Sequence, residues 1–277
     1  MSLAPPLAPP LAPPLATLPR VAVSGTSLFP GERVLAEETA VALVYDGATH
    51  AVMMASPADL EDFALGFSLT EAIVSAAGAI EELEVVPRGA LGCEVRMRLA
   101  EESGLRQLGR RRALAGPVGC GLCGIQSLEE AARAVPPVRS ALRLWPGAIE
   151  AAMAALAEAQ AMNRDARAVH AAAFWRPDHG LVAIREDVGR HNALDKLAGA
   201  LARAGEAGAG GLIALTSRVS VEMVQKAARI GAPVIAAVSA PTALAVRTAE
   251  ACGVTLVAVA RGSGFEVFTH PVRVIGS

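Results

Sequence analysis

The chain has 277 residues, of which 53% are hydrophobic and 3% aromatic, and its formal net charge is −2. A charge this close to zero provides no positive field for nucleic acid or anionic lipid, so we expect neither as a partner. No apolar run approaches the roughly 18 residues that cross a bilayer, and four cysteines are too few for a disulfide framework, so we expect a soluble, cytoplasmic protein.

The amino terminus, residues 1–20, repeats the tetrapeptide Leu-Ala-Pro-Pro. Paired prolines favour an extended polyproline conformation that makes no regular hydrogen bonds, so a disordered tail is predicted. The segment lacks both the charged start and the unbroken apolar stretch of a secretory signal peptide. The length of the remaining chain favours two domains.

Residues 21–114 are predicted to form an amino-terminal α+β domain. Valine-rich segments with partial alternation favour two or three strands within residues 33–44 and 51–54, and further strands at 80–87 and 93–99. Between them, Ser56 with Asp59 three residues later is typical of a capping box and predicts the start of a helix. The apolar positions that share one face of this helix are Leu60, Phe63, Ala64, Phe67 and Val74.

The next segment, residues 115–126, is predicted to be a mobile loop, because the stretch 116–124 contains a proline and four glycines. It also contains Cys120 and Cys123, in the order Gly-Cys-Gly-Leu-Cys-Gly. The loop therefore joins two domains and exposes two thiols in a chain with only two other cysteines.

Residues 127–277 are predicted to form an α/β domain. Helices are expected at residues 127–134, 148–162, 190–204, 221–230 and 242–251, and strands at 168–175, 181–184, 212–216, 234–238 and 254–260. Short apolar strands alternating with helices indicate a sheet covered on both faces. Ligands of such sheets bind beyond the carboxyl ends of the strands, so the polar loops 216–220, 239–242 and 261–264 are expected to converge on one rim.

Four interpretations of the cysteine pair remain open from the residues alone. A structural zinc site needs two further ligands, and no second close pair is present. A thioredoxin-type dithiol usually opens a helix after a strand, and two inert thiols in an exposed loop would be prone to oxidation. The fourth interpretation, a sulfur carrier, suits a mobile glycine-rich loop, because the thiolate must reach both a donor and an acceptor.

Other polar residues are candidates for the same rim. Asp187 is predicted to cap the helix at 190–204, His191 to pair with Asp195 one turn later, and Ser220 to cap the helix at 221–230. The arginine run 110–112 would draw phosphates or keep nearby thiols ionised. The alternative is that these residues only cap helices or face solvent.

Six motifs occur in order along the chain: SPADLEDFALGF at 56–67, GCGLCG at 119–124, REDVGRHNALDK at 185–196, SRVSVEMVQKAAR at 217–229, SAPTALAV at 239–246 and FTHP at 268–271. Together they resemble the FdhD family, the formate dehydrogenase accessory sulfurtransferases. The resemblance extends from about residue 21 to the end of the chain.

This resemblance implies a homodimeric sulfurtransferase that takes sulfur from a cysteine desulfurase. The acceptor would be the molybdenum or tungsten bis(molybdopterin guanine dinucleotide) cofactor, before its insertion into formate dehydrogenase, with no tightly bound metal of the protein's own. The family's carrier cysteine corresponds to Cys120, with Cys123 as its companion. Its cofactor-binding segment corresponds to Val259, Ala260, Arg261, Gly262, Ser263 and Gly264. Its carboxyl-terminal half is similar to the cytidine deaminase fold, which implies an α/β/α sandwich.

Deamination itself is not expected, because a zinc deaminase needs His-x-Glu followed later by Pro-Cys-x-x-Cys. The nearest match here, His170-Ala171-Ala172, lacks the glutamate, and the cysteine pair precedes it. The remaining alternative is a chaperone without enzymatic activity, which binds and protects the cofactor while the cysteines line its entry.

Overall fold

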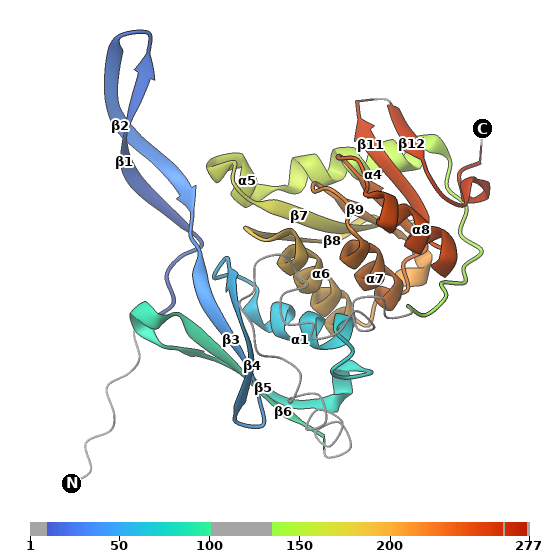
Figure 1. Cartoon of the computed structure of the whole chain (residues 1–277), viewed down its shortest axis with the longest axis horizontal. Helices are drawn as coiled ribbons and strands as arrows, with labels where there is room; N and C mark the ends of the chain where they lie inside the picture. Colours follow the sequence, from blue (N-terminus) through green and yellow to red (C-terminus); the bar gives the residue numbers. More distant parts are fainter. Residues whose placement is uncertain (1–9, 101–134, 263, 276–277) are drawn as a thin grey trace.

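The structure is a computed structural model of the chain and describes residues 10–100, 135–262 and 264–275. Figure 1 shows a hairpin that projects from the body of the molecule, a small sheet, and a larger sheet covered by helices. The predicted loop at 115–126 and the helix expected at 127–134 lie outside the described residues. No helix in the described ranges combines the length and apolar character needed to span a bilayer.

The hairpin consists of β1 (Leu15–Ser24) and β2 (Ser27–Ala36), paired antiparallel along their whole length. The prediction of a disordered tail up to residue 20 is therefore wrong from Leu15 onward. Cross-strand hydrogen bonds hold the chain extended, and Pro19 is tolerated because a two-stranded ribbon leaves one edge of each strand unpaired. Most residues of the hairpin are exposed.

The small sheet has the strand order β4-β3-β6-β5. Its strands are β3 (Thr39–Tyr45), β4 (Ala48–Ala55), β5 (Ile80–Pro87) and β6 (Cys93–Leu99), and only β3 and β6 pair in parallel. Alternate residues of β3, namely Val41, Leu43 and Tyr45, are fully buried with Phe63 of helix α1 (Leu60–Thr70). A helix packed against a mostly antiparallel sheet gives this part of the chain the predicted α+β character.

The larger sheet has the order β12-β11-β10-β9-β7-β8. Its strands are β7 (His170–Arg176), β8 (Gly180–Asp187), β9 (Leu212–Leu215), β10 (Val234–Ala237), β11 (Thr255–Arg261) and β12 (Gly264–Val267). The strands β9, β10 and β11 are parallel, whereas β7 is antiparallel to both β8 and β9. The short edge strand β12 was not anticipated from the sequence.

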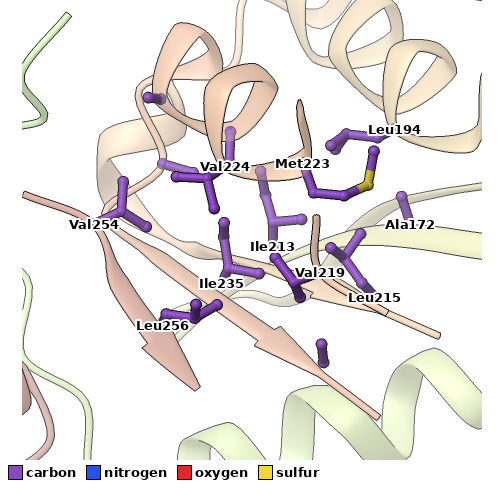
Figure 2. Packing of buried hydrophobic residues seen from close by; sticks show 14 of the residues in the cluster. Ala172, Leu194, Ile213, Leu215, Val219, Met223, Val224, Ile235, Val254 and Leu256 are labelled. Atoms are coloured by element: carbon purple, nitrogen blue, oxygen red, sulfur yellow. The ribbon is translucent and has the colours of Figure 1, made fainter. Parts of the chain in front are cut away.

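Helices cover both faces of this sheet, which confirms the predicted sandwich. Ile213, Ile235 and Leu256 pack toward α6 (Arg190–Ala204), α7 (Val221–Ile230) and α8 (Ala243–Cys252), as Figure 2 shows for the buried cluster on that face. The neighbouring residues in each strand, Leu212, Val234 and Val257, face α4 (Pro146–Ala159). The single helix predicted at 148–162 is instead α4 followed by α5 (Ala161–Ala166), with a break at Gln160.

Helices α1 and α6 touch through their backbones. A Cβ atom on Gly66 of α1 would lie 1.7 Å from the carbonyl oxygen of Asp195, and one on Gly199 of α6 would lie 2.0 Å from that of Asp62. Only glycine permits so close an approach. The two parts of the chain are therefore packed against each other through this helix pair. Short 3₁₀ turns complete the fold at Ala77–Ala79, Gly89–Leu91, Gly208–Gly210 and Pro271–Arg273.

Candidate ligand-binding rim

Three loops meet where the parallel strands β9, β10 and β11 end. The backbone of Thr242 donates to Val219 at 2.9 Å, and that of Val238 donates to Leu215 at 3.0 Å. The Nε atom of Arg261 donates to the carbonyl of Val238 at 3.3 Å. The predicted convergence of these loops is thus observed. We call these loops, together with the first turns of α6, α7 and α8, the rim.

Helix α6 begins at this same edge, although it follows β8 rather than one of the three parallel strands. Because β7 is antiparallel to both β8 and β9, the end of β8 lies at the edge where β9 ends. Three helix amino termini therefore gather at the rim, and each presents unpaired backbone N–H groups and the positive end of its dipole. Such termini favour an anionic ligand.

Three arginines strengthen this positive character. Arg190 opens α6, Arg218 lies in the loop after β9, and Arg261 ends β11. None of the three forms an ion pair with a carboxylate within the described ranges. An arginine without a carboxylate partner is available to bind phosphate, which it can do through two parallel hydrogen bonds.

The turn that leads into α6 is fixed by a buried network around Asp187. This carboxylate pairs with Lys196 at 2.6 Å, and both side chains are fully buried. It also accepts from the backbone of Gly189 and from Asn192 of α6, and from the backbone of Ser56 near α1. Asp187 thus orients the turn through Gly189, the N-cap residue, rather than by capping the first turn of α6 as predicted.

Two further capping predictions are wrong. Helix α1 starts at Leu60 without a side-chain cap, and the hydroxyl of Ser56 instead accepts from the backbone of Val188 at 3.1 Å. Ser220 occupies the N-cap position of α7, but its side chain makes no capping bond. At α8, by contrast, the hydroxyl of Thr242 accepts from Ala245 at 3.2 Å.

The predicted pair of His191 with Asp195 is also wrong. Asp195 is buried and accepts from Lys226 of α7 at 2.8 and 3.0 Å and from the Thr70 hydroxyl of α1 at 2.5 Å. Burial disfavours the charged form of Lys226, but Asp195 and Glu71 outweigh that effect and raise its pKa above the ordinary value. This network joins three helices beneath the rim.

His191 instead faces Glu222 at the start of α7. Its Nε2 atom lies 4.0 Å from the Glu222 Oε2 atom, and only 13% of the His191 side chain is exposed. Burial, with the nearby charges of Arg190 and Lys226, lowers the pKa of His191 to about 4. The imidazole is therefore neutral at pH 7. Spacing along the sequence did not point to Glu222, because it lies on a different helix from His191.

The predicted cofactor-binding segment lies at the end of β11. Val259 has a φ of 53°, which is rare for a β-branched residue, and the pairing of β11 with β12 shifts register between Ala258 and Arg261. Gly262 turns the chain with a φ of 60° into β12, which Gly264 begins. Such backbone strain often marks functional segments. Ser263, Cys120 and Cys123 lie outside the described residues.

The geometry defines a mixed α/β protein whose sheet edge is suited to an anionic ligand. The comparisons with known proteins are more specific, since the model of the FdhD/NarQ family matches residues 36–275. The chain belongs to this family. It is 56% identical to the sulfur carrier protein FdhD of Agrobacterium fabrum, over 88% of this chain and 90% of that protein. It is 52% identical to the sulfur carrier protein FdhD of Cupriavidus necator, over 86% of this chain and 83% of that protein.

A solved structure shares the fold. It is a crystal structure of a formate dehydrogenase accessory protein from Desulfotalea psychrophila, with a TM-score of 0.77 and 24% sequence identity. The match covers 95% of this chain and all of that one. At this level of identity, the likeness concerns the fold.

Proposed function

We propose that this protein is a sulfur carrier for formate dehydrogenase. It accepts persulfide sulfur from a cysteine desulfurase on Cys120 and transfers it to a molybdenum or tungsten bis(molybdopterin guanine dinucleotide) cofactor, before that cofactor enters the dehydrogenase. The relatives named sulfur carrier protein FdhD support the sulfur-carrying role. The cofactor is the substrate here, not a resident group.

The observation that carries the cofactor-binding part of the proposal is the charge of the rim. Three helix amino termini and three arginines, none of which pairs with a carboxylate among the described residues, surround the carboxyl ends of β9, β10 and β11. A dinucleotide cofactor carries several phosphate charges, which such groups stabilise. The strained segment beginning at Val259 brings its backbone to this same edge, where its amides would contact the cofactor.

The sulfur chemistry is assigned to Cys120, with Cys123 as its companion, partly because the two other cysteines are unsuitable. Cys93 and Cys252 are buried, and burial raises the pKa of both thiols. A buried thiol of raised pKa is a poor nucleophile, since the thiolate is the reactive form. In the transfer, the Cys120 thiolate attacks the terminal sulfur of the donor persulfide. The donor's S–S bond breaks, and the donor cysteine leaves as a thiolate.

Complementation of a strain that lacks the protein tests this role. We expect Cys120→Ala to abolish formate dehydrogenase activity, because it removes the proposed carrier thiolate and the two cysteines of the described residues, Cys93 and Cys252, are buried. Cys252→Ala is the matched control, since it removes a thiol in the core and should leave activity near the wild-type level. Full activity with Cys120→Ala would contradict the proposal.

A cofactor chaperone that does not carry sulfur is the second candidate, because the rim could bind a cofactor without help from the cysteines. Incubation with a desulfurase and ³⁵S-labelled cysteine separates the two functions. A carrier becomes labelled and loses the label on reduction, whereas a chaperone stays unlabelled. We further propose a cytoplasmic homodimer, which light scattering and cell fractionation would test.

A further inference from the structure

Arg273, close to the carboxyl end of the chain, is a buried arginine that pairs with no carboxylate among the described residues. Only 9% of this residue is exposed, and its Nε atom has no hydrogen-bond partner within the described ranges. Its Nη1 atom donates to the hydroxyl of Thr255 at 3.0 Å. A buried positive charge without a counter-ion is costly, so this arrangement requires an explanation.

A second arginine lies beside Arg273. The backbone of Leu144 donates to the carbonyl of Arg273 at 2.8 Å, and that of Ile275 donates to the carbonyl of Leu144 at 2.9 Å. This short parallel pairing places the exposed residue Arg143 next to Arg273. Burial and then the charge of Arg143 lower the pKa of Arg273. The side chain of Arg143 donates to the carbonyl of the preceding residue at 3.2 Å and pairs with no carboxylate in the described ranges.

Helix α4 begins at this same pairing. Its N-cap residue is Trp145, no side chain caps its first turn, and that turn contains no acidic residue. Backbone N–H groups and the positive end of the helix dipole therefore lie next to the two arginines. Three sources of positive charge thus meet at one place, and a carboxylate is the protein group that complements them.

Large exposed apolar side chains border the two arginines. Trp145 is 48% exposed, Val272 69% and Ile275 46%. Because side chains alternate along paired extended segments, Trp145 and Ile275 lie on the same side of the pairing as the arginines, whereas Leu144 is fully buried. Exposed tryptophan and arginine residues contribute much of the binding energy of protein interfaces. A small anion would leave the apolar side chains in water, so a protein partner fits this surface better.

This surface lies at the edge of the larger sheet opposite the rim. Thr255, which contacts Arg273, begins β11, and Arg261 ends the same strand at the rim. A strand of 7 residues separates the two edges by about 20 Å. A protein bound at the far edge therefore leaves the rim accessible. In the proposed function the dehydrogenase must reach the rim to receive the cofactor, whereas the sulfur donor needs to reach only Cys120.

We propose that the surface formed by Arg143, Trp145, Val272, Arg273 and Ile275 binds the sulfur donor, through an acidic side chain of the donor that is flanked by apolar residues. The carboxylate pairs with the two arginines at the start of α4, and its apolar neighbours cover Trp145. The inference rests on the proposed function, in which a cysteine desulfurase supplies the sulfur. We call this set of five residues the docking surface.

Transfer of ³⁵S from labelled cysteine to the full-length protein, measured over a range of desulfurase concentrations, tests this inference. Arg143→Glu places a negative charge in the docking surface, and Trp145→Ala removes its largest apolar side chain. Each variant should raise the desulfurase concentration that gives half-maximal labelling about tenfold, the usual effect of losing an important interface residue. At saturating desulfurase the labelling rate should return to that of the wild type, because only docking is weakened.

Arg33→Glu and Leu91→Ala are the matched controls. Arg33 is an exposed residue of the β1–β2 hairpin, and Leu91 is 84% exposed in the turn between β5 and β6. Both controls should keep the half-maximal desulfurase concentration of the wild type. Thermal unfolding of every variant identifies one that does not fold, in which case the other docking-surface variant decides the test.

The possible results separate this inference from the proposed function. Labelling of the wild type that is unaffected by Arg143→Glu and Trp145→Ala would overturn the docking surface and leave the sulfur-carrying role intact. If light scattering shows that Arg143→Glu converts a dimer into a monomer, a second copy of the chain covers this surface, and the inference is again overturned. Absence of labelling in the wild type would contradict both proposals.

Discussion

His191 shows how its surroundings set the protonation state of a side chain at the rim. Burial and the charges of Arg190 and Lys226 lower its pKa from 6.5 to about 4, against the raising effect of Glu222 and Glu71. Between these two pH values, the unfolded chain binds a proton that the folded protein does not. The free energy of unfolding therefore falls as the pH falls from about 6.5 to 4.

We expect this histidine alone to remove about 3 kcal/mol of stability by pH 4, because each unit of pKa shift corresponds to about 1.4 kcal/mol. Urea unfolding of the wild type and of His191→Gln at several pH values isolates this contribution, since other titrating groups are common to both proteins. Parallel stability curves for the two proteins between pH 7 and 4 would contradict the assignment.

Lys226 is the second residue whose environment makes a quantitative prediction. Replacement by methionine leaves the buried carboxylate of Asp195 without its cation, which should lower the free energy of unfolding by about 3–5 kcal/mol. The control is Arg98→Met, because Arg98 is 52% exposed and pairs with Glu82 at the surface. This control should cost less than about 1 kcal/mol in the same denaturation experiment. Similar losses of unfolding free energy for the two variants would show that burial does not determine how much the Lys226–Asp195 pair contributes to stability.

At the level of elements, the contact between α1 and α6 depends on glycine. Gly66→Ala should lower the free energy of unfolding by about 3 kcal/mol or more, although alanine is the better helix former, because its Cβ would overlap a backbone carbonyl of α6. Gly78→Ala is the control, since nothing lies within 4 Å of its Cβ position. Thermal unfolding compares the two, and equal stability would refute the close packing of these helices.

The β1–β2 hairpin is expected to be the least stable element. Its large apolar residues Leu18, Val21, Val23, Leu28 and Phe29 are at least half exposed, so little apolar burial supports its hydrogen bonds. Amides of β1 and β2 should therefore exchange with solvent far faster than those of the buried strand β10. Hydrogen-exchange mass spectrometry measures both segments in one experiment. Equal protection of β1 and β10 would contradict this prediction.

Local periodicity explains which elements could be predicted. The bounds of β5, β6, α6 and α7 agree with the sequence prediction, because each is defined by its own alternation or helical apolar face. The hairpin strand β1 could not be predicted in this way, since its extended form depends on pairing with β2. The prolines that suggested a tail are compatible with that pairing.

The polar contacts at the rim could not be predicted from local spacing either. Spacing along one helix suggested that His191 pairs with Asp195, but Asp195 is held by Lys226, which is distant in sequence on another helix. Spacing also suggested a cap at Ser220, whose side chain has no hydrogen-bond partner among the residues that the structure describes. The convergence of the loops at the rim could be predicted, because the direction of parallel strands follows from the alternating order of strands and helices.

At the scale of the whole molecule, the proposed function combines a binding rim in the described fold with a thiol that lies outside the described residues. The rim supplies positive charge and hydrogen-bonding groups for an anionic cofactor. In that proposal Cys120 carries the sulfur, and the two described cysteines do not, because they are buried. The proposed function therefore requires that Cys120 be reachable by a donor protein and able to approach the rim.

Mass spectrometry of the intact protein, before and after incubation with a cysteine desulfurase and cysteine, tests this requirement most directly. We expect a gain of about 32 Da, the mass of one sulfur atom, on the peptide that contains Cys120. The gain should disappear on reduction with dithiothreitol and should be absent from Cys120→Ala. A protein that gains no sulfur, or gains it equally in Cys120→Ala, would contradict the proposed role as a sulfur carrier.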